Sequence, residues 1–127
     1  YEHYEVVADY FYIRELRVAH KSEDYFYKAR KLFRYFPENR QMIKEITDGA
    51  LEIVNDVSRL KVIQLWAGKT VENPKDFDAV YNYALISYKC GFKETGRKHA
   101  RVANTIASQS GDTGNQEKAN RLMKQVQ

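Results

Sequence analysis

Proline, glycine and cysteine are all scarce in this chain. Its 127 residues include two prolines, six glycines and one cysteine. So few chain breakers argue against a loop-rich β fold and against a disordered chain. The single cysteine, Cys90, excludes an intramolecular disulfide and a cysteine-rich zinc site, but it does not fix the redox compartment. Because 43% of the residues are hydrophobic, the chain can bury a core, and we expect one domain over residues 1–127.

The sequence also lacks a long apolar run. No segment approaches the ~18 consecutive apolar residues that span a bilayer, and no signal peptide is visible. Because the chain begins at Tyr1 and not at methionine, we expect it to be a fragment of a longer protein. Targeting or membrane segments would then lie upstream. The sequence is compatible with the cytoplasm and with the periplasm.

Charge of one sign is only slightly in excess, with 21 basic against 17 acidic residues and a formal net charge of +4. Both signs are interspersed, as on the exposed faces of ordinary helices, whereas a nucleic-acid-binding protein more often concentrates its basic residues in a stripe. We therefore do not expect a nucleic acid as the partner. The basic run "KETGRKHAR" is interpreted as a solvated helix face, with phosphate or anionic lipid as alternative ligands.

Residues that could carry chemistry are isolated from one another. Cys90 precedes Gly91 at an expected helix C-terminus, where the helix dipole disfavours a thiolate. The three histidines form no HExxH motif or His/Cys cluster. Carboxylate pairs such as Glu23 and Asp24 lie at expected helix starts, where compensation of the dipole explains them. The stretch "GDTG" lacks the spacing and the lysine of a phosphate-binding loop. We expect no catalytic residue, no metal and no cofactor.

Helical periodicity fills the segments between the few breakers. Over residues 4–20, for example, apolar side chains recur at Val6, Val7, Tyr10 and Ile13. The whole pattern predicts about seven antiparallel helices without a strand, which is an all-α fold. The predicted N-caps are Ser22, Ser58 and Asn73, the last followed by Pro74 as the first helical residue. The predicted helix stops are Pro37, Gly91 and the stretch "SGDTG" over residues 110–114.

An offset of 34 residues aligns residues 49–74 with residues 83–108, so that Ala50 falls on Ala84 and Trp66 falls on Ala100. Two antiparallel helices that cross closely need a small residue at the crossing, and Ala50, Ala84 and Gly96 would supply it. A period near 34 built from helix pairs resembles the tetratricopeptide repeat (TPR). Pro37 comes early in the first unit and a serine stands at the proline site of the third, so the repeat is degenerate.

The resemblance implies three units of about 5–37, 38–73 and 74–110, followed by a capping helix over residues 115–127. In such arrays the first helices of successive units line a concave groove that receives a peptide or another helix. The chain would then be a non-catalytic interaction module, a scaffold, whose partner is another protein or a peptide. The groove positions that the resemblance implies are Lys44, Thr47, Leu51 and Asn55 in the second unit and Tyr81, Asn82, Leu85, Tyr88 and Lys89 in the third.

A second resemblance rests on the segments "ARKLFRYFPENRQM" and "DFDAVYNYALISYKCGF". These look like the soluble tails that follow the last membrane span of some bacterial O-antigen polymerase or ligase-type glycosyltransferases. This alternative implies a periplasmic accessory tail, held near a membrane by upstream segments that contain the chemistry. Seven of the ten tyrosines lie in residues 1–35, where they would serve the core, a partner surface or a membrane interface. Neither resemblance indicates an oligomeric state.

Overall fold

The computed structural model describes residues 3–72 and 76–127 of the chain. Within those ranges it contains seven α-helices, one short 3-10 helix and no strand, so the predicted all-α fold is confirmed. The helices are α1 (His3–Val18), α2 (Ser22–Tyr35), α3 (Arg40–Ile53), α4 (Val57–Ala67), η1 (Gly68–Val71), α5 (Phe77–Lys89), α6 (Lys93–Ser110) and α7 (Thr113–Gln125).

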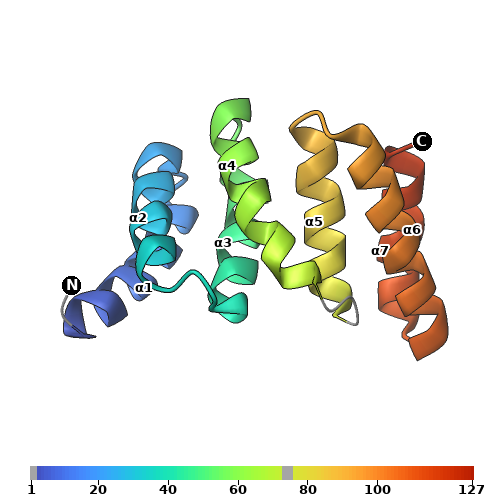
Figure 1. Ribbon diagram of the computed structural model, residues 1–127, viewed down its shortest axis with the longest axis horizontal. Helices are drawn as coiled ribbons and strands as arrows, with labels where there is room; N and C mark the ends of the chain where they lie inside the picture. Colours follow the sequence, from blue (N-terminus) through green and yellow to red (C-terminus); the bar gives the residue numbers. More distant parts are fainter. Residues whose placement is uncertain (1–2, 73–75) are drawn as a thin grey trace.

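The helices stand side by side along the long axis of the molecule, and the two termini lie at opposite ends of it (Figure 1). Each of α1, α3 and α5 packs against the helix that follows it, and α6 packs against α7. We call α1, α3, α5 and α7 the first helices and α2, α4 and α6 the second helices. The first helices contact one another in succession, α1 with α3, α3 with α5 and α5 with α7. In Figure 1, α2, α4 and α6 lie in front of α1, α3 and α7. The chain therefore forms two layers, one of first helices and one of second helices.

The apolar core follows this row. One cluster extends from Ile13 and Leu16 of α1 to Ile86 of α5, and Trp66 of α4 lies within it. There the Trp66 ring stacks on Phe33 of α2, with ring centroids 4.5 Å apart. Two further clusters join α5, α6 and α7. No single centre holds the fold, because each helix buries its apolar face against its neighbours in the row.

Asparagine or aspartate begins four of the helices. The side-chain oxygens of Asn39, Asp56, Asp76 and Asp112 accept hydrogen bonds from the backbone N–H three residues later, at 3.0 to 3.3 Å. Such a bond satisfies one of the N–H groups that a helix start leaves without a partner. These four residues are therefore the N-caps of α3, α4, α5 and α7.

Two of the predicted N-caps are wrong. Ser58 is the second residue of α4, which begins at Val57 because Asp56 caps it. Ser22 is the first residue of α2, and Lys21 before it makes no side-chain capping bond. Asn73 and Pro74 lie outside the described residues, and the described start of α5 is Phe77.

The predicted helix stops are confirmed. Helix α2 ends at Tyr35, two residues before Pro37, because the residue before a proline avoids the helical conformation. Gly91 and Gly111 follow α5 and α6 with φ values of +102° and +73°. This left-handed conformation suits glycine at the residue after a helix.

Small residues lie where the predicted close crossing needs them. Ala50, Ala84 and Ala100 are all fully buried. A Cβ atom on Gly96 would lie 2.8 Å from the Cβ of Tyr88 and 3.0 Å from the backbone oxygen of Ala84. Only glycine therefore lets α6 approach α5 this closely.

Ion pairs link neighbouring units at a nearly constant spacing. Arg14 pairs with Glu45, Arg17 with Asp48, Lys44 with Asp76, and Lys69 with Glu38, and in these four pairs the partners are 31 or 32 residues apart. Arg17 also pairs with Glu52, which is 35 residues away. Three of the four pairs join one first helix to the next or to its N-cap. The spacing shows that positions about one hairpin apart in the sequence become neighbours in the row.

Candidate functional site

A polar groove crosses the layer of first helices. It has a volume of about 410 Å³, and α1, α3, α5 and α7 all contribute side chains to it. We call it the first-helix groove, and its lining residues are Arg14, Gln41, Lys44, Glu45, Asp48, Asp78, Asn82 and Lys118. Four helices that are distant in the sequence therefore meet at one surface.

Fixed ion pairs form part of this groove. The Nε atom of Arg14 lies 2.5 Å from Oε1 of Glu45, and the hydroxyl of Tyr10 donates to the same carboxylate. The hydrogen bond from Arg14 lowers the pKa of Glu45 more than its partial burial raises it. Further along, Lys44 Nζ lies 2.5 Å from Oδ2 of Asp76. These carboxylates are ionised at neutral pH, so the pairs hold α1, α3 and the start of α5 in register.

Other groups of the groove remain available to a ligand. Asp78 and Lys118 form no ion pair with any described residue. The ammonium of Lys118 lies 4.5 Å from the centroid of the Tyr81 ring, which orients it. Gln41 is exposed, and Asn82 is only 9% exposed at the base of the groove. Amide side chains donate and accept hydrogen bonds as a peptide group does, so this set suits a peptide backbone with charged side chains of both signs.

Two of the nine predicted groove residues, Lys44 and Asn82, line the first-helix groove. Thr47 is 1% exposed, and its hydroxyl donates to the carbonyl of Ile43 at 2.8 Å. Leu51 and Leu85 are half-buried against the core clusters. These three side chains stabilise the helices from which they come.

The other four predicted positions are not among the lining residues, although Tyr81 contacts Lys118, which is. Asn55 is exposed in the connection between α3 and α4. Lys89 donates to the carbonyl of Leu51 at 3.3 Å and so joins the end of α5 to α3. The rings of Tyr81 and Tyr88 are half-buried, and Tyr88 lies 5.8 Å from the ammonium of Lys93.

Several lining residues were not predicted, although one signal for them was present. Gln41, Lys44, Glu45 and Asp48 follow the i, i+3, i+4, i+7 spacing of a single helix face, so the sequence already placed these polar groups together. Arg14 and Lys118 had no such signal, because their place depends on how α1 and α7 stack against α3 and α5. Lys118 in particular lies in the segment 115–127, which was predicted only to be a helix that caps the last unit.

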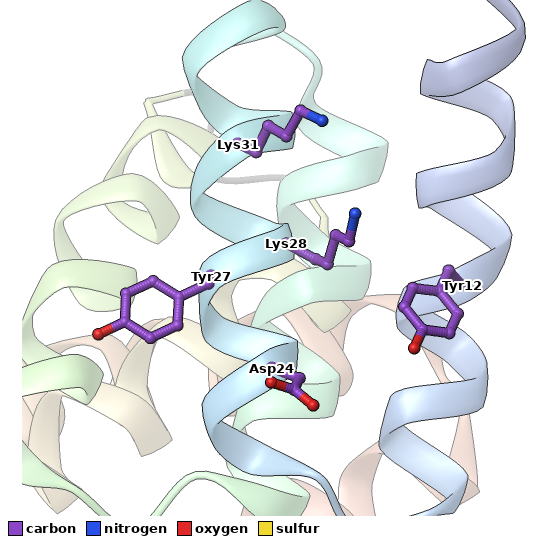
Figure 2. Close-up of a pocket in the computed structure, with 5 residues that line it drawn as sticks. All are labelled: Tyr12, Asp24, Tyr27, Lys28 and Lys31. Atoms are coloured by element: carbon purple, nitrogen blue, oxygen red, sulfur yellow. The ribbon is translucent and has the colours of Figure 1, made fainter.

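A second hollow, of about 430 Å³, lies at α1 and α2 and is drawn in Figure 2. Lys28 and Lys31 extend from α2 toward α1, where Asp9 pairs with both, at 2.9 and 3.4 Å. Tyr12 of α1 and Tyr27 of α2 both line this hollow, and in Figure 2 their rings lie on opposite sides of α2. Two lysines in a hollow would suggest an anion-binding site. Because Asp9 already pairs with both of them, this hollow is a weak candidate for one.

The N-terminal end carries an apolar groove of about 400 Å³ between α1, α2 and the start of α3. Leu32 and Met42 form its buried floor, while Val7, Phe11 and Phe36 are exposed at its edge. Some of the tyrosines concentrated in residues 1–35 are also exposed at this end of the molecule, for example Tyr4 and Tyr35, whereas Tyr25 is buried in the core. The first helix of a row has no preceding helix to cover its outer side, which explains the exposure.

Among the described residues, groups that could support catalysis or bind a metal do not cluster. Cys90 is buried, and burial raises the pKa of its thiol, which disfavours the reactive thiolate. The Nδ1 atom of His99 lies 2.9 Å from the carbonyl of Thr95, and its ring packs edge-on against Tyr83. In the ranges 3–72 and 76–127, no three His, Cys, Asp or Glu side chains come together to hold a metal ion. In the same ranges no helix combines the length and the apolar character that crossing a membrane requires.

Comparison of the chain with models of protein families, with curated proteins and with solved structures finds no match.

Proposed function

We propose that the chain is a TPR-like array of three helical hairpins with a terminal helix, and that it binds a peptide segment of a partner protein in the first-helix groove. The observation that carries this proposal is the composition of the groove, to which four successive first helices all contribute. A ligand that follows the row would contact every hairpin.

The repeat assignment draws support from geometry that recurs along the chain. Ion pairs 31 or 32 residues apart join successive units. The first helices contact one another in order, and each hairpin pairs a first helix with a second helix. Stacking of this kind buries the apolar face of each unit only against its neighbours, which is the physical basis of a helical repeat.

The ligand we propose is an extended or helical peptide with both acidic and basic side chains. Lys118 would bind a carboxylate and Asp78 a cationic side chain, because neither is engaged by a described ion pair. Gln41 and Asn82 would hold the peptide backbone through their amide groups. Such polar recognition favours specificity and a moderate affinity.

Selection of a random dodecapeptide library on the 127-residue chain tests the proposal. We expect enriched peptides to bind with micromolar affinity in calorimetry. The variants N82A and K118A should each bind them about tenfold more weakly, because each loses one hydrogen bond to a charged or buried group. The matched control is K124A, which removes an exposed lysine from the same helix as Lys118.

The control K124A should leave the affinity unchanged. If enriched peptides bind N82A and K118A as tightly as the unaltered chain, the first-helix groove is not their site. Failure to enrich any peptide would also contradict the proposal.

A further inference from the structure

The two layers of helices differ in their balance of charge. Helices α2, α4 and α6 together contain ten basic and three acidic residues. Helices α1, α3, α5 and α7 contain eight basic and eight acidic residues. The excess of basic residues is therefore concentrated in the layer of second helices. The layer of second helices is the cationic side of the molecule.

Several cations of this layer are free of acidic partners. These side chains are exposed and form no ion pair with any described residue: Arg30 and Arg34 on α2, Lys61 on α4, and Lys98 and Arg101 on α6. Glu94, the acidic residue of α6, is already engaged by Arg97 at 3.3 Å. The positive charge is therefore distributed over all three helices and not confined to the run "KETGRKHAR".

Apolar side chains lie among these cations. Leu65 of α4 is 73% exposed, one turn after Lys61, and Tyr27 and Phe92 are 52% and 43% exposed. Two cation–π contacts bring the helices together here. Arg59 lies 5.6 Å from the Tyr27 ring of α2, and Lys61 lies 5.9 Å from the ring of Phe92, the residue before α6. Figure 2 shows the Tyr27 ring directed away from α1, on the far side of α2.

We propose that this second-helix face, the exposed sides of α2, α4 and α6, docks on a bilayer surface that contains anionic phospholipid. The excess of cations complements the negative headgroups, and each basic side chain near such a surface adds to the attraction. Leu65, Tyr27 and Phe92 would insert at the level of the headgroups, where an apolar body with a polar or cationic neighbour is accommodated. A nucleic acid would use the cations but would gain nothing from an exposed leucine, so the lipid surface accounts for more of the observations.

Sedimentation of the 127-residue chain with vesicles tests this docking at 0.15 M salt. We expect binding to vesicles of 70% phosphatidylcholine and 30% phosphatidylserine, and little binding to phosphatidylcholine alone. The double variant K61Q/R101Q should bind about 25-fold more weakly, because each cation near the surface contributes about fivefold. L65S should lose about fivefold while keeping the salt dependence, because it removes apolar insertion and no charge.

The matched control is R121Q/K124Q, which removes two exposed cations from α7, in the other layer. It lowers the net charge by the same amount and should change the affinity less than twofold. Circular dichroism of each variant establishes that it is folded. Equal effects of the two double variants would overturn the proposal, as would equal binding to vesicles without phosphatidylserine. Tight binding to a 20-nucleotide single strand, lost in K61Q/R101Q and accompanied by no vesicle binding, would assign the face to nucleic acid instead.

Discussion

At the scale of single residues, two glycines show how closely the helices approach. The hydroxyl of Tyr25 donates to the carbonyl of Ile46 at 2.9 Å, and the same hydroxyl occupies the space where a Cβ on Gly49 would be. Burial raises the pKa of this hydroxyl, so it stays protonated and keeps donating. A tyrosine of the aromatic N-terminal segment is thus fixed in the core by a glycine 24 positions later.

Gly96→Ala should destabilise the chain, although alanine is the better helix former. The added Cβ would lie within 3.1 Å of backbone atoms of Tyr88 and Ala84, which cannot move aside cheaply. Overpacking of this kind costs about 1–3 kcal/mol, and the helix propensity returns about 1 kcal/mol. We expect a net loss of up to about 2 kcal/mol in urea unfolding. Gly114→Ala is the control, because the nearest atom to its added Cβ lies at an ordinary 3.4 Å and a small gain in stability is expected there.

Glu45 should make the stability depend on pH in the acid range. The hydrogen bond from Arg14 lowers its pKa below the ordinary value of 4.5 in the folded chain. A lowered folded pKa gives stability that is present above pH 4.5 and is lost as the pH falls through the folded value. Urea unfolding from pH 6 to pH 3 should therefore show decreasing stability. In E45Q the decrease should be smaller, and an unchanged profile would show that the pair with Arg14 is too weakly formed to matter.

At the scale of elements, helix starts were harder to predict than helix stops. Gly91 and Pro37 end helices through their own backbone geometry, which no neighbour can change. A cap can be any of several polar residues near a helix start, and in "NDVS" both Asp56 and Ser58 qualify. Packing of Leu60 and Ile63 into the core decides where α4 begins, and this information is not local.

Substitution at the two candidate caps of α4 distinguishes them. Asp56→Ala removes the acceptor that lies 3.1 Å from the N–H of Arg59 and should cost about 1 kcal/mol. Ser58→Ala replaces an exposed residue inside the helix and should change the stability by less than about 0.5 kcal/mol. Thermal unfolding of both variants provides the measurement. A larger loss for S58A than for D56A would contradict the cap seen in the structure.

At the scale of the whole molecule, the row of helices decides which predictions about the groove could succeed. Lys44 on α3 and Asn82 on α5 were expected at the groove from the resemblance to the TPR, and both line it. Arg14 and Lys118 enter the same groove only because α1 and α7 stack at the two ends of the first-helix layer. The difference in charge between the layers likewise appears only when α2, α4 and α6 are placed side by side. Local patterns therefore predict faces, and stacking determines which faces meet.

The stacking of the helices in a row also predicts how the molecule unfolds. Leu122 of α7 is 1% exposed and packs with Ala84 and Ala100 at the C-terminal end, while Leu32 of α2 is fully buried at the other end. Either substitution by alanine should cost about 3 kcal/mol. In an array each helix contacts only its neighbours. L122A should therefore accelerate hydrogen exchange in α5, α6 and α7 more than in α1 and α2. L32A should accelerate it more in α1 and α2 than in α5, α6 and α7. Uniform acceleration along the chain in both variants would mean that the helices unfold as one cooperative bundle, and the repeat assignment would fail.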